Sequence, residues 1–592
     1  MAGLGGKMPP EHLALPPTDH PLEFSEPWLA PRSLAILTVL AVASWLIYIG
    51  IALSGQSLHE EGSGGHSLLT ILSLFATAFG CYLAAIRIAL RAPQDTRLLK
   101  IIVIAAVVFR GTMLFSDPIE EIDLYRYLWD GAASTSGVNP FRYSPEQVLA
   151  ASLDDALPEE LGRLVNLRDR SPAMASILDR VHFGELPTVY PPVSQTVFAL
   201  AALVTPIDAS LATRMIVMKA VFVGFDLATL WLLIRLLRLT GRAVGWSLAY
   251  GWCPLLLKEI SNSGHLDALA VFLTTLAAFF AVRALHDTSV MPGLGCHHFR
   301  RVQMALLAAF VLALAVGAKL YPIVLAPLFL LSFGQRLGWR VAAVAGGVFS
   351  VATAAVLWPM LPTRQLAPLP QMARSSQFDS APLPPAELDP TPRDPSQSLR
   401  AFLSDWEMND FLFLLVMENV RPTAHLPQRE KAWFSIVPES WRVACVGAVS
   451  RHISTEPERI PFFVSRALTS LAFCGAAGWF AWCGRRAGTP ASWLQFAFLT
   501  LAWFWLLLPT INPWYWTWAL PLLPFARARA WLVLSGLVFL YYLRFWLVFH
   551  FGDTPVLGTG YTGPWFFDYV ITWLEFGPWF GWLIWSGMKL RS

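Results

Sequence analysis

Acidic side chains crowd the stretch between positions 117 and 130, and their spacing could support acid–base chemistry. The stretch reads Ser116-Asp-Pro-Ile-Glu-Glu-Ile-Asp-Leu-Tyr-Arg-Tyr-Leu-Trp-Asp130. Pro118 and the early acids predict a helix over 119–135. One face of that helix carries Glu120, Asp123, Tyr127 and Asp130. Crowding and partial desolvation raise the basicity of one carboxylate, which suits it to accept a proton from a hydroxyl. The competing interpretation is ordinary helix-end electrostatics, with the acids in water and Asp123 paired with Arg126.

Polar residues also interrupt apolar stretches elsewhere, and we expect these breaks on the same side of a membrane. The breaks are Tyr190-Pro-Pro192, Asn262-Ser-Gly-His265-Leu-Asp267 after Lys258 and Glu259, Lys319-Leu-Tyr321-Pro322, and Asn512-Pro-Trp514-Tyr515-Trp516. Ionisable groups at membrane depth are costly and usually mark a ligand path. We therefore treat these breaks as functional candidates.

Each break also has a structural alternative. His265 and Asp267 would equally form a mutually bonded pair at a helix turn. Lys319 either extends its ammonium group to the headgroups or binds a phosphate as a compact point charge. Trp514 and Trp516 are more typical of an aromatic belt than of a platform for a sugar.

Membrane-spanning helices must position these residues. Of the 592 residues, 55% are hydrophobic and 14% are charged, with a mean hydropathy of +0.51. Separate water-soluble domains of this composition would lack the polar surface that covers a core. The net charge of +3 is too small and too dispersed for nucleic-acid binding, so we expect no nucleic acid among the partners.

Apolar runs and the basic residues between them predict the topology. We expect an all-α polytopic membrane protein, a bundle of about 12–14 transmembrane helices with large exterior loops. Several passes are short, and residues 193–206 suit a half-buried or re-entrant helix. The expected segments are a cytoplasmic tail (1–32), three spans (33–115), an exterior catalytic loop with amphipathic helices (116–192), core spans (193–358), an exterior Pro-rich loop (359–461) and C-terminal spans (462–592).

Several enzyme classes are excluded by the motifs that the sequence lacks. It has no Walker-type loop, no GxGxxG, no HExxH and no GxSxG. The predicted cytoplasmic turns leave no room for a nucleotide-sugar-binding domain. Outward-facing carboxylates therefore suggest a substrate that is already outside or is dissolved in the membrane, and a lipid-linked phosphosugar fits that requirement.

The motifs together resemble the polyprenyl-phosphate-dependent membrane glycosyltransferases of the GT-C superfamily, in the bacterial mannosyltransferase-like branch related to the GPI mannosyltransferase. The resemblance extends over about 117–516. It is carried by Asp123-Leu-Tyr-Arg-Tyr-Leu-Trp-Asp130-Gly with Gly137-Val-Asn-Pro, Tyr190-Pro-Pro, Gly264-His-Leu-Asp267, Ala318-Lys-Leu-Tyr-Pro322, Trp406-Glu-Met-Asn-Asp410 and Asn512-Pro-Trp-Tyr. The acid cluster is more extended than the simplest family pattern, and two additional spans precede it.

The resemblance implies transfer of mannose from a polyprenyl-phosphate sugar to a lipid-linked or glycan acceptor. It places the general base at Asp123, with Glu121 and Asp117 as rivals, and the donor phosphate at Lys319, aided by Arg126. Substrate-binding candidates are Tyr127, Asp130, Tyr190, His265, Asp267, Tyr321, Trp514 and Tyr515. A divalent metal held by Glu120, Glu121 and Asp123 stays open, because hard cations favour oxygen ligands, although the spacing does not demand one.

Two other classes of protein compete with a transferase. A secondary transporter or flippase also has broken helices, but its charges should lie within the spans rather than in loops. A noncatalytic envelope subunit would use the loops for protein contacts. We expect a multi-pass protein of a bacterial inner membrane, with its active site on the periplasmic, exterior face and membrane lipids around it.

Overall fold

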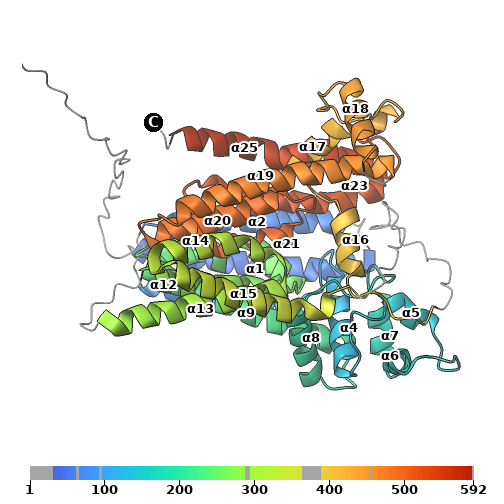
Figure 1. Ribbon diagram of the computed structural model, residues 1–592, viewed down its shortest axis with the longest axis horizontal. Coiled ribbons are helices and arrows are strands. Elements are labelled where there is room, and N and C mark those ends of the chain that lie inside the picture. Colours follow the sequence, from blue (N-terminus) through green and yellow to red (C-terminus); the bar gives the residue numbers. More distant parts are fainter. Residues whose placement is uncertain are drawn as a thin grey trace, which may run out of the picture.

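Helices form nearly all of the regular structure in this computed structural model (Figure 1). The structure describes residues 31–61, 66–91, 96–286, 294–362, 389–452 and 456–589. Within these ranges no strand forms, and nine helices are long and apolar enough to cross a membrane. The chain is therefore an all-α, multi-pass membrane protein, which confirms the fold class expected from composition.

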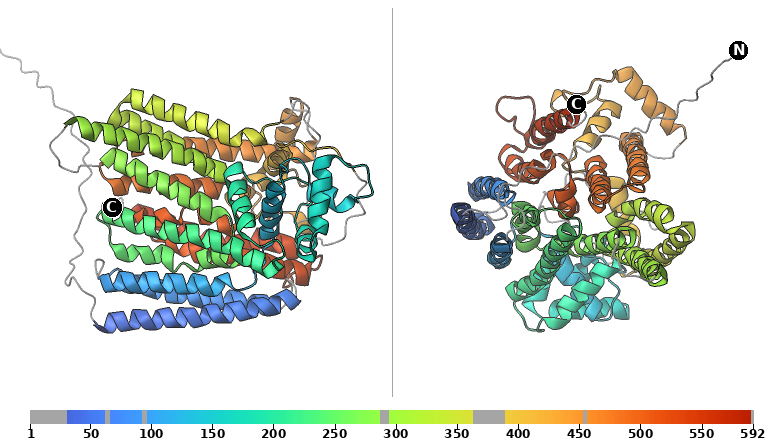
Figure 2. Two further views of the ribbon diagram at one scale, coloured as in Figure 1. Left: turned by 90° about the horizontal axis from the view of Figure 1, so that it is seen from below. Right: turned by 90° about the vertical axis from the view of Figure 1, so that its left-hand side faces the viewer.

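The candidate spans run roughly parallel, with the N-terminal helices along one edge of the bundle (Figure 2). They comprise α1 (Pro31–Glu61), α2 (His66–Ala89), α9 (Leu211–Leu239), α12 (Asp267–His286), α13 (Leu294–Ala318), α15 (Trp339–Leu357), α19 (Ile460–Gly484), α20 (Pro490–Leu507) and the run α22–η8–α23 (Ala530–Phe551). Helix α3 (Thr96–Leu114) packs beside α1, and α25 (Thr572–Lys589) packs beside α22 (Ala530–Leu537).

Shorter helices gather at one end of the bundle, which we call the loop end (Figures 1 and 2). They are α4 (Asp123–Thr135), α5 (Pro145–Ala150), α6 (Glu159–Asp169), α7 (Pro172–Asp179), α8 (Pro192–Val204), α16 (Gln397–Asp405), α17 (Leu412–Val420) and α18 (Glu439–Ser450). With 13 residues, α8 is about 20 Å long, shorter than the membrane is thick. It packs against α4 so closely that a Cβ on Gly131 would lie 2.4 Å from the Phe198 carbonyl oxygen.

Three apolar stretches are broken rather than continuous helices, where the sequence predicts short passes. The first contains η1 (Val244–Ser247), α10 (Leu248–Gly251), α11 (Pro254–Leu256) and the π-helix η2 (Leu257–Asn262); the second is η3 (Tyr321–Leu325) with α14 (Ala326–Leu337); the third is α21 (Pro513–Trp516) with η7 (Leu520–Phe525). Prolines lie in all three, and a proline removes a helical hydrogen bond and crowds the preceding turn.

The acidic segment departs from the sequence prediction at its start. The helix begins at Asp123 and not at 119, and Glu120 has a left-handed φ of +46°. The Glu121 carboxylate explains this boundary, because it accepts hydrogen bonds from the amides of Ile122 and Asp123 at 2.9 and 2.6 Å and so caps the helix from outside. Glu120 therefore does not share the helical face predicted for it.

Every predicted segment except 116–192 contains residues outside the described ranges, and the tail and the Pro-rich loop contain most of them. Residues 1–30 of the expected tail and residues 363–388 of the expected Pro-rich loop belong to the ranges that are not described. The described part of that loop joins the bundle at Met408, whose amide donates to the Pro509 carbonyl at 2.9 Å and whose carbonyl accepts from the Ile511 amide at 3.1 Å. This pairing brings the segment against the third broken stretch.

Candidate active site

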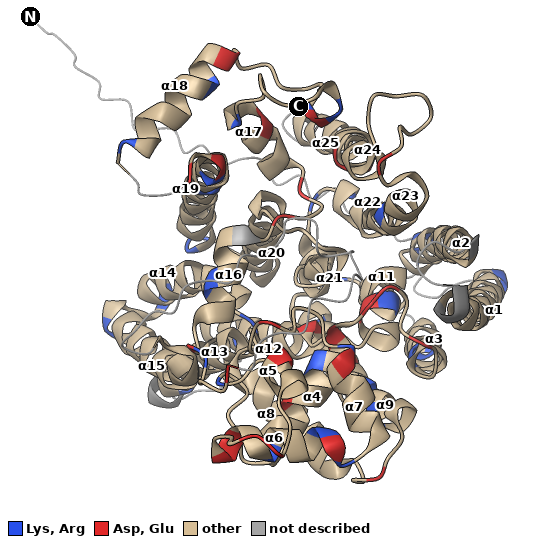
Figure 3. Ribbon diagram, turned by 90° about the vertical axis from the view of Figure 1, so that its right-hand side faces the viewer, with Lys and Arg blue, Asp and Glu red and all other residues tan. Residues whose placement is uncertain are grey.

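A cavity of about 1250 Å³ opens at the loop end, where the second and third broken stretches meet the acidic segment. The first broken stretch does not line the cavity but leads to His265, which contacts Glu121. Figure 3 looks onto this end and shows acidic and basic segments between α4, α11, α12 and α21. Nine of the residues singled out from the sequence line the cavity: Asp117, Glu120, Glu121, Asp123, Tyr190, Lys319, Tyr321, Trp514 and Tyr515. The fold thus brings together residues that lie almost 400 positions apart in the sequence.

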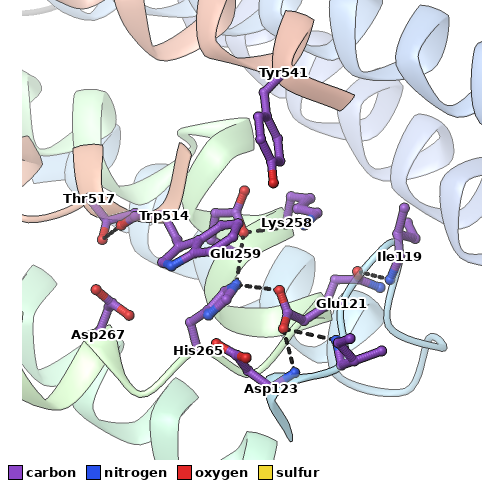
Figure 4. Close-up of polar contacts among 12 residues, drawn as sticks. Ile119, Glu121, Asp123, Lys258, Glu259, His265, Asp267, Trp514, Thr517 and Tyr541 are labelled. Carbon is purple, nitrogen blue, oxygen red and sulfur yellow. Dashed lines mark hydrogen bonds and ion pairs between the residues drawn. The ribbon is translucent and has the colours of Figure 1, made fainter. Parts of the chain in front are cut away.

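Glu121 and Asp123 stand side by side at the cavity wall (Figure 4). Both carboxylate oxygens of Glu121 have partners, because Oε1 accepts from the two backbone amides of the helix start and Oε2 lies 2.8 Å from His265 Nε2. Asp123 is the first residue of α4 and is half-buried. Of the two, Asp123 has the carboxylate that is less committed to the protein.

Burial and charge move the pKa values of these groups apart. Burial, and then the negative charge of Glu121, raise the pKa of Asp123 to about 6. Burial would also raise the pKa of Glu121, but the charge of His265 outweighs it and lowers that pKa to about 2. Burial opposes a charge on His265, yet Glu121 and Glu259 raise its pKa to about 10. At neutral pH the His265 imidazolium lies between the carboxylates of Glu121 and Glu259. The more basic carboxylate of Asp123 lies beside them.

A chain of buried polar groups continues behind His265. Its Nε2 lies 3.3 Å from Glu259 Oε2, and Lys258 Nζ lies 3.2 Å from the same oxygen. The Tyr542 hydroxyl donates to Glu259 Oε1 at 2.6 Å and accepts from Lys258 Nζ at 2.5 Å. The His265 ring stacks on Trp514 with centroids 4.5 Å apart, as Figure 4 shows. These contacts fix the imidazole against the wall of the cavity.

The local backbone explains how the imidazole reaches this place. Lys258 and Glu259 lie on the π-helix η2, whose wider turn departs from the α-helical spacing of side chains. Asn262 ends this helix and ties it to the acidic segment, since its Nδ2 donates to the Asp117 carbonyl at 2.6 Å and its Oδ1 accepts from the Ile119 amide at 2.9 Å. Gly264 then turns the chain with a φ of +74°, a conformation that glycine adopts without strain.

Lys319 and Asp267 form a second charged group at the cavity. Lys319 Nζ donates to both oxygens of Asp267 at 2.7 Å, and Trp518 Nε1 donates to Oδ1 at 2.5 Å. Lys319 Nζ also lies 4.5 Å from the centroid of the Tyr515 ring. Asp267 is fully buried behind the wall, whereas Lys319 is 17% exposed and faces the cavity. His265 and Asp267 therefore have separate partners and do not bond each other.

Stacked aromatic rings surround this ion pair. Trp518 lies between Tyr321 and Tyr515, with centroid distances of 4.2 and 4.5 Å. Trp516, by contrast, is fully buried and donates its indole N–H to Ser535 at 3.1 Å, so it serves neither as a membrane belt nor as a platform at the cavity.

Three predicted site residues have structural contacts instead. Arg126 donates to the carbonyls of His182, Phe183 and Leu186 at 2.8–3.1 Å, and it lines a small recess beside Asp123 but not the cavity that contains Lys319. Tyr127 is buried and stacks on Phe198 with centroids 4.8 Å apart, and Asp130 is buried and accepts from Gln195 at 3.0 Å. The reason is that α4 packs against α8, so of its residues only Asp123 and Tyr125, in its first turn, line the cavity.

One cluster among the described residues has the composition of a metal site. Ligand atoms of Glu121, Asp123 and His265 lie within 4.8 Å of one another, so these three residues could hold a cation. The sequence suggested Glu120 as the third ligand, and the structure puts His265 there. The imidazolium form of His265 compensates the same carboxylate charge without a metal.

Sequence reasoning missed several residues of the site. Lys258 and Glu259 are a charged pair inside an apolar run. Charged groups at membrane depth cost free energy, so this pair was itself a signal of function. Trp518 follows the Asn512 motif by less than two turns and was not among the predicted residues. Tyr542 carries no sequence signal, because its partners are 283 and 284 residues away and only the fold brings them together.

A comparison with protein families identifies the family of the chain. The model for the N-terminal domain of the alpha-(1->6)-mannopyranosyltransferase family matches residues 34–335, about half of the chain. The chain belongs to this family. It is a mannosyltransferase, as the resemblance implied, and so uses a sugar donor and a glycan acceptor. Comparison with curated proteins and with solved structures gave no match. The matched range contains Asp123, His265 and Lys319, while Trp514 and Tyr542 come from beyond it.

Proposed function

We propose that this mannosyltransferase takes mannose from a polyprenyl-phosphate donor and transfers it, with inversion, to a hydroxyl of a lipid-linked or envelope glycan. The proposal places the reaction at the exterior face of a bacterial inner membrane, with Asp123 as the general base. The observation that carries it is the cavity at the loop end, because it has Asp123 and Lys319 at its polar part and an apolar lining beyond them.

Asp123 is the best candidate for the base among the three acids considered. The Glu121 carboxylate accepts hydrogen bonds from two backbone amides and pairs with the His265 imidazolium. Its pKa is therefore low, which makes it a poor proton acceptor. Burial and the charge of Glu121 keep the pKa of Asp123 at about 6, so that it is ionised at neutral pH and still basic. Asp117 lines the cavity but lies outside the Glu121–His265 cluster.

In the reaction, the acceptor oxygen attacks the anomeric carbon while the bond from that carbon to the phosphate oxygen breaks. The hydroxyl proton moves to Asp123, and the polyprenyl phosphate leaves with the bonding electron pair. Lys319 stabilises the phosphate as its charge develops, and Asp267 and Trp518 hold the lysine in place. A single displacement of this kind inverts the anomeric centre.

The apolar lining supports a lipid donor. Side chains from α19 and α20 line the cavity beyond Lys319 and Tyr515, namely Phe473, Cys474, Phe504, Leu507 and Leu508. A polyprenyl chain needs an apolar path that begins at its phosphate, and these residues offer one within the membrane-spanning part of the bundle.

The distribution of basic residues supports the exterior location. Arg87, Arg238, Arg283 and Arg336 lie in the last turns of α2, α9, α12 and α14, at the end opposite to the loop end. Basic residues favour the cytoplasmic side of a membrane, so the loop end and its cavity would face outward.

The direct test is transfer by the purified, full-length protein in lipid vesicles. Radiolabelled polyprenyl-phosphate mannose and a membrane lipid extract should yield labelled mannose in an alpha-(1->6) linkage. Use of a nucleotide-activated mannose in place of the lipid donor, or no transfer from the lipid donor, would contradict the proposal.

A further inference from the structure

A small recess of about 40 Å³ opens beside Asp123, away from Lys319. The same carboxylate lines both this recess and the main cavity. The other walls of the recess come from Ile122 and Arg126, from the 182–190 segment and from α16 with Trp406. Asp123 therefore lies where the recess adjoins the main cavity, which contains Lys319 and the apolar path.

Three aromatic side chains, Phe183, Phe402 and Trp406, form a continuous surface that lines both spaces; we call it the aromatic wall. The Trp406 ring centroid lies 4.7 Å from that of Phe183 and 5.0 Å from that of Phe402. All three residues are half-buried, so part of each ring faces open space. Sugar rings present apolar C–H faces that pack on aromatic rings, and their hydroxyl groups then point sideways.

Phe183 occupies a strained conformation that the protein holds in place. Its φ is +53°, in the left-handed region that a bulky residue avoids. Arg126 donates to the Phe183 carbonyl at 2.8 Å and to the His182 carbonyl at 3.0 Å. Since Arg126 lies three residues after Asp123 on α4, the same helix positions both the base and this part of the wall. Strain of this kind persists where the surroundings over-determine it, which is typical of functional sites.

Trp406 is fixed from the opposite side. Its carbonyl accepts from the Thr510 hydroxyl at 3.1 Å, directly before the Asn512 motif of the site. Two residues later, Met408 pairs with the backbone at Pro509 and Ile511. The wall is thus attached both to α4 and to the broken stretch that carries Trp514 and Tyr515, although 223 residues separate Phe183 from Trp406.

We propose that the aromatic wall is the subsite for the acceptor, where the terminal pyranose of a glycan stacks on Trp406 and Phe402 with its attacking hydroxyl at Asp123. This inference rests on the proposed function, because it takes Asp123 as the base. The donor phosphate lies at Lys319, which lines the main cavity and not the recess. The remainder of the acceptor extends past the 182–190 segment and α16, at the loop end.

Kinetics of the full-length enzyme test the subsite with Trp406→Ala and Phe402→Ala, using alpha-(1->6)-linked mannotriose as acceptor. Removing a buried aromatic contact typically weakens binding about tenfold to thirtyfold. We expect the KM for mannotriose to rise by that factor and the KM for the donor to stay within about twofold. Trp441→Ala is the matched control, because this tryptophan lies on α18, is 71% exposed and does not line the cavity. Equal changes in both KM values, or no change for mannotriose, would overturn the proposal.

A binding measurement separates this inference from the proposed function. Mannotriose is titrated into the protein without donor, and we expect Trp406→Ala to weaken binding about tenfold and Trp406→Phe, which retains a ring, to restore most of it. If the wild-type protein transfers mannose from the lipid donor while Trp406→Ala binds mannotriose as tightly as wild type, the subsite is wrong and the function stands. If the wild-type protein binds mannotriose through Trp406 but transfers no mannose from the lipid donor, the function is wrong and the subsite stands.

Discussion

Glu121 and Asp123 are two residues apart and both carry a carboxylate, but their surroundings suit the two carboxylates to different roles. Glu121 caps α4 and holds His265, so its charge is part of the framework. Burial and the negative charge of Glu121 raise the pKa of Asp123, so its carboxylate is more basic. A pair of acids whose pKa values are pushed apart is a common arrangement at sites of proton transfer.

Replacing Asp123 by Asn removes the proposed base but keeps the size of the side chain. We expect mannose transfer to fall about a hundredfold to ten-thousandfold, while the protein still inserts and folds. Rates of transfer from labelled donor to acceptor measure the effect. Asp154→Asn is the control, since Asp154 is an exposed acid at the loop end and should retain wild-type rates. Near-normal turnover of the Asp123 variant would remove the assignment.

Glu121→Gln should shift the pH dependence of transfer. In the wild-type protein Asp123 must be ionised, so kcat/KM should fall below about pH 6, by about tenfold for each further pH unit. The introduced amide keeps an oxygen for the backbone amides but carries no charge, so the pKa of Asp123 should decrease. The acidic limb of the kcat/KM profile should therefore move to lower pH. A limb that stays in place or moves upward would show that another group titrates.

Lys319→Gln tests the phosphate site. Glutamine can still donate to Asp267, but it has no charge to stabilise the leaving phosphate. We expect the KM for the lipid donor to rise and kcat to fall, with little change in the KM for the acceptor. Equal losses for both substrates would argue against a phosphate at Lys319.

At this scale, local sequence signals located residues that the structure brings together. The cost of a lysine or histidine in an apolar run pointed to Lys319 and His265, and both lie at the site. Sequence reasoning failed for Arg126, because the three carbonyl groups that bind the guanidinium group lie 56–60 residues further along the chain. No spacing rule relates Arg126 to them.

At the scale of elements, the interruptions in the apolar helices matter more than the helices themselves. Prolines and polar residues in the sequence indicated the three broken stretches. The second and third line one cavity, and the first leads to His265, which contacts Glu121 at the wall of that cavity. The start of α4 could not be placed from sequence, because the expected proline start at Pro118 competes with a cap supplied by the Glu121 side chain. Irregular backbone beside such breaks needs partners. The Asn262 side chain bonds the backbone of Asp117 and Ile119, and Met408 bonds the backbone of Pro509 and Ile511.

Gly264→Ala should disturb the break that carries His265. A Cβ there would lie 2.9 Å from Lys219 Cγ, and the φ of +74° would strain any residue but glycine. We expect a loss of stability of more than about 1 kcal/mol, seen as a lower melting temperature in detergent, together with reduced transfer. Gly347→Ala is the matched control, because this glycine lies in α15 with open space around it, and alanine favours a helix. A Gly264 variant as stable and active as the Gly347 variant would contradict this reading of the turn.

At the scale of the whole molecule, the proposed chemistry depends on which side of the membrane the loop end occupies. Single cysteines at Asp154 and Arg91, in a protein whose own cysteines are replaced, report on the two ends of the bundle. An impermeant maleimide applied to intact cells should label position 154 and leave position 91 unlabelled until the membrane is opened. Labelling of position 91 alone would place the cavity on the cytoplasmic side and refute the proposed location.

The hydrogen bonds from Tyr542 to Glu259 and from Trp518 to Asp267 join the two halves of the polypeptide, so each half supplies part of the candidate site. If the gene were divided between α15 and α16, each fragment alone would be inactive. Mannose transfer would return only when the two fragments associate in the bilayer. Enzyme turnover would then serve as a reporter of their assembly.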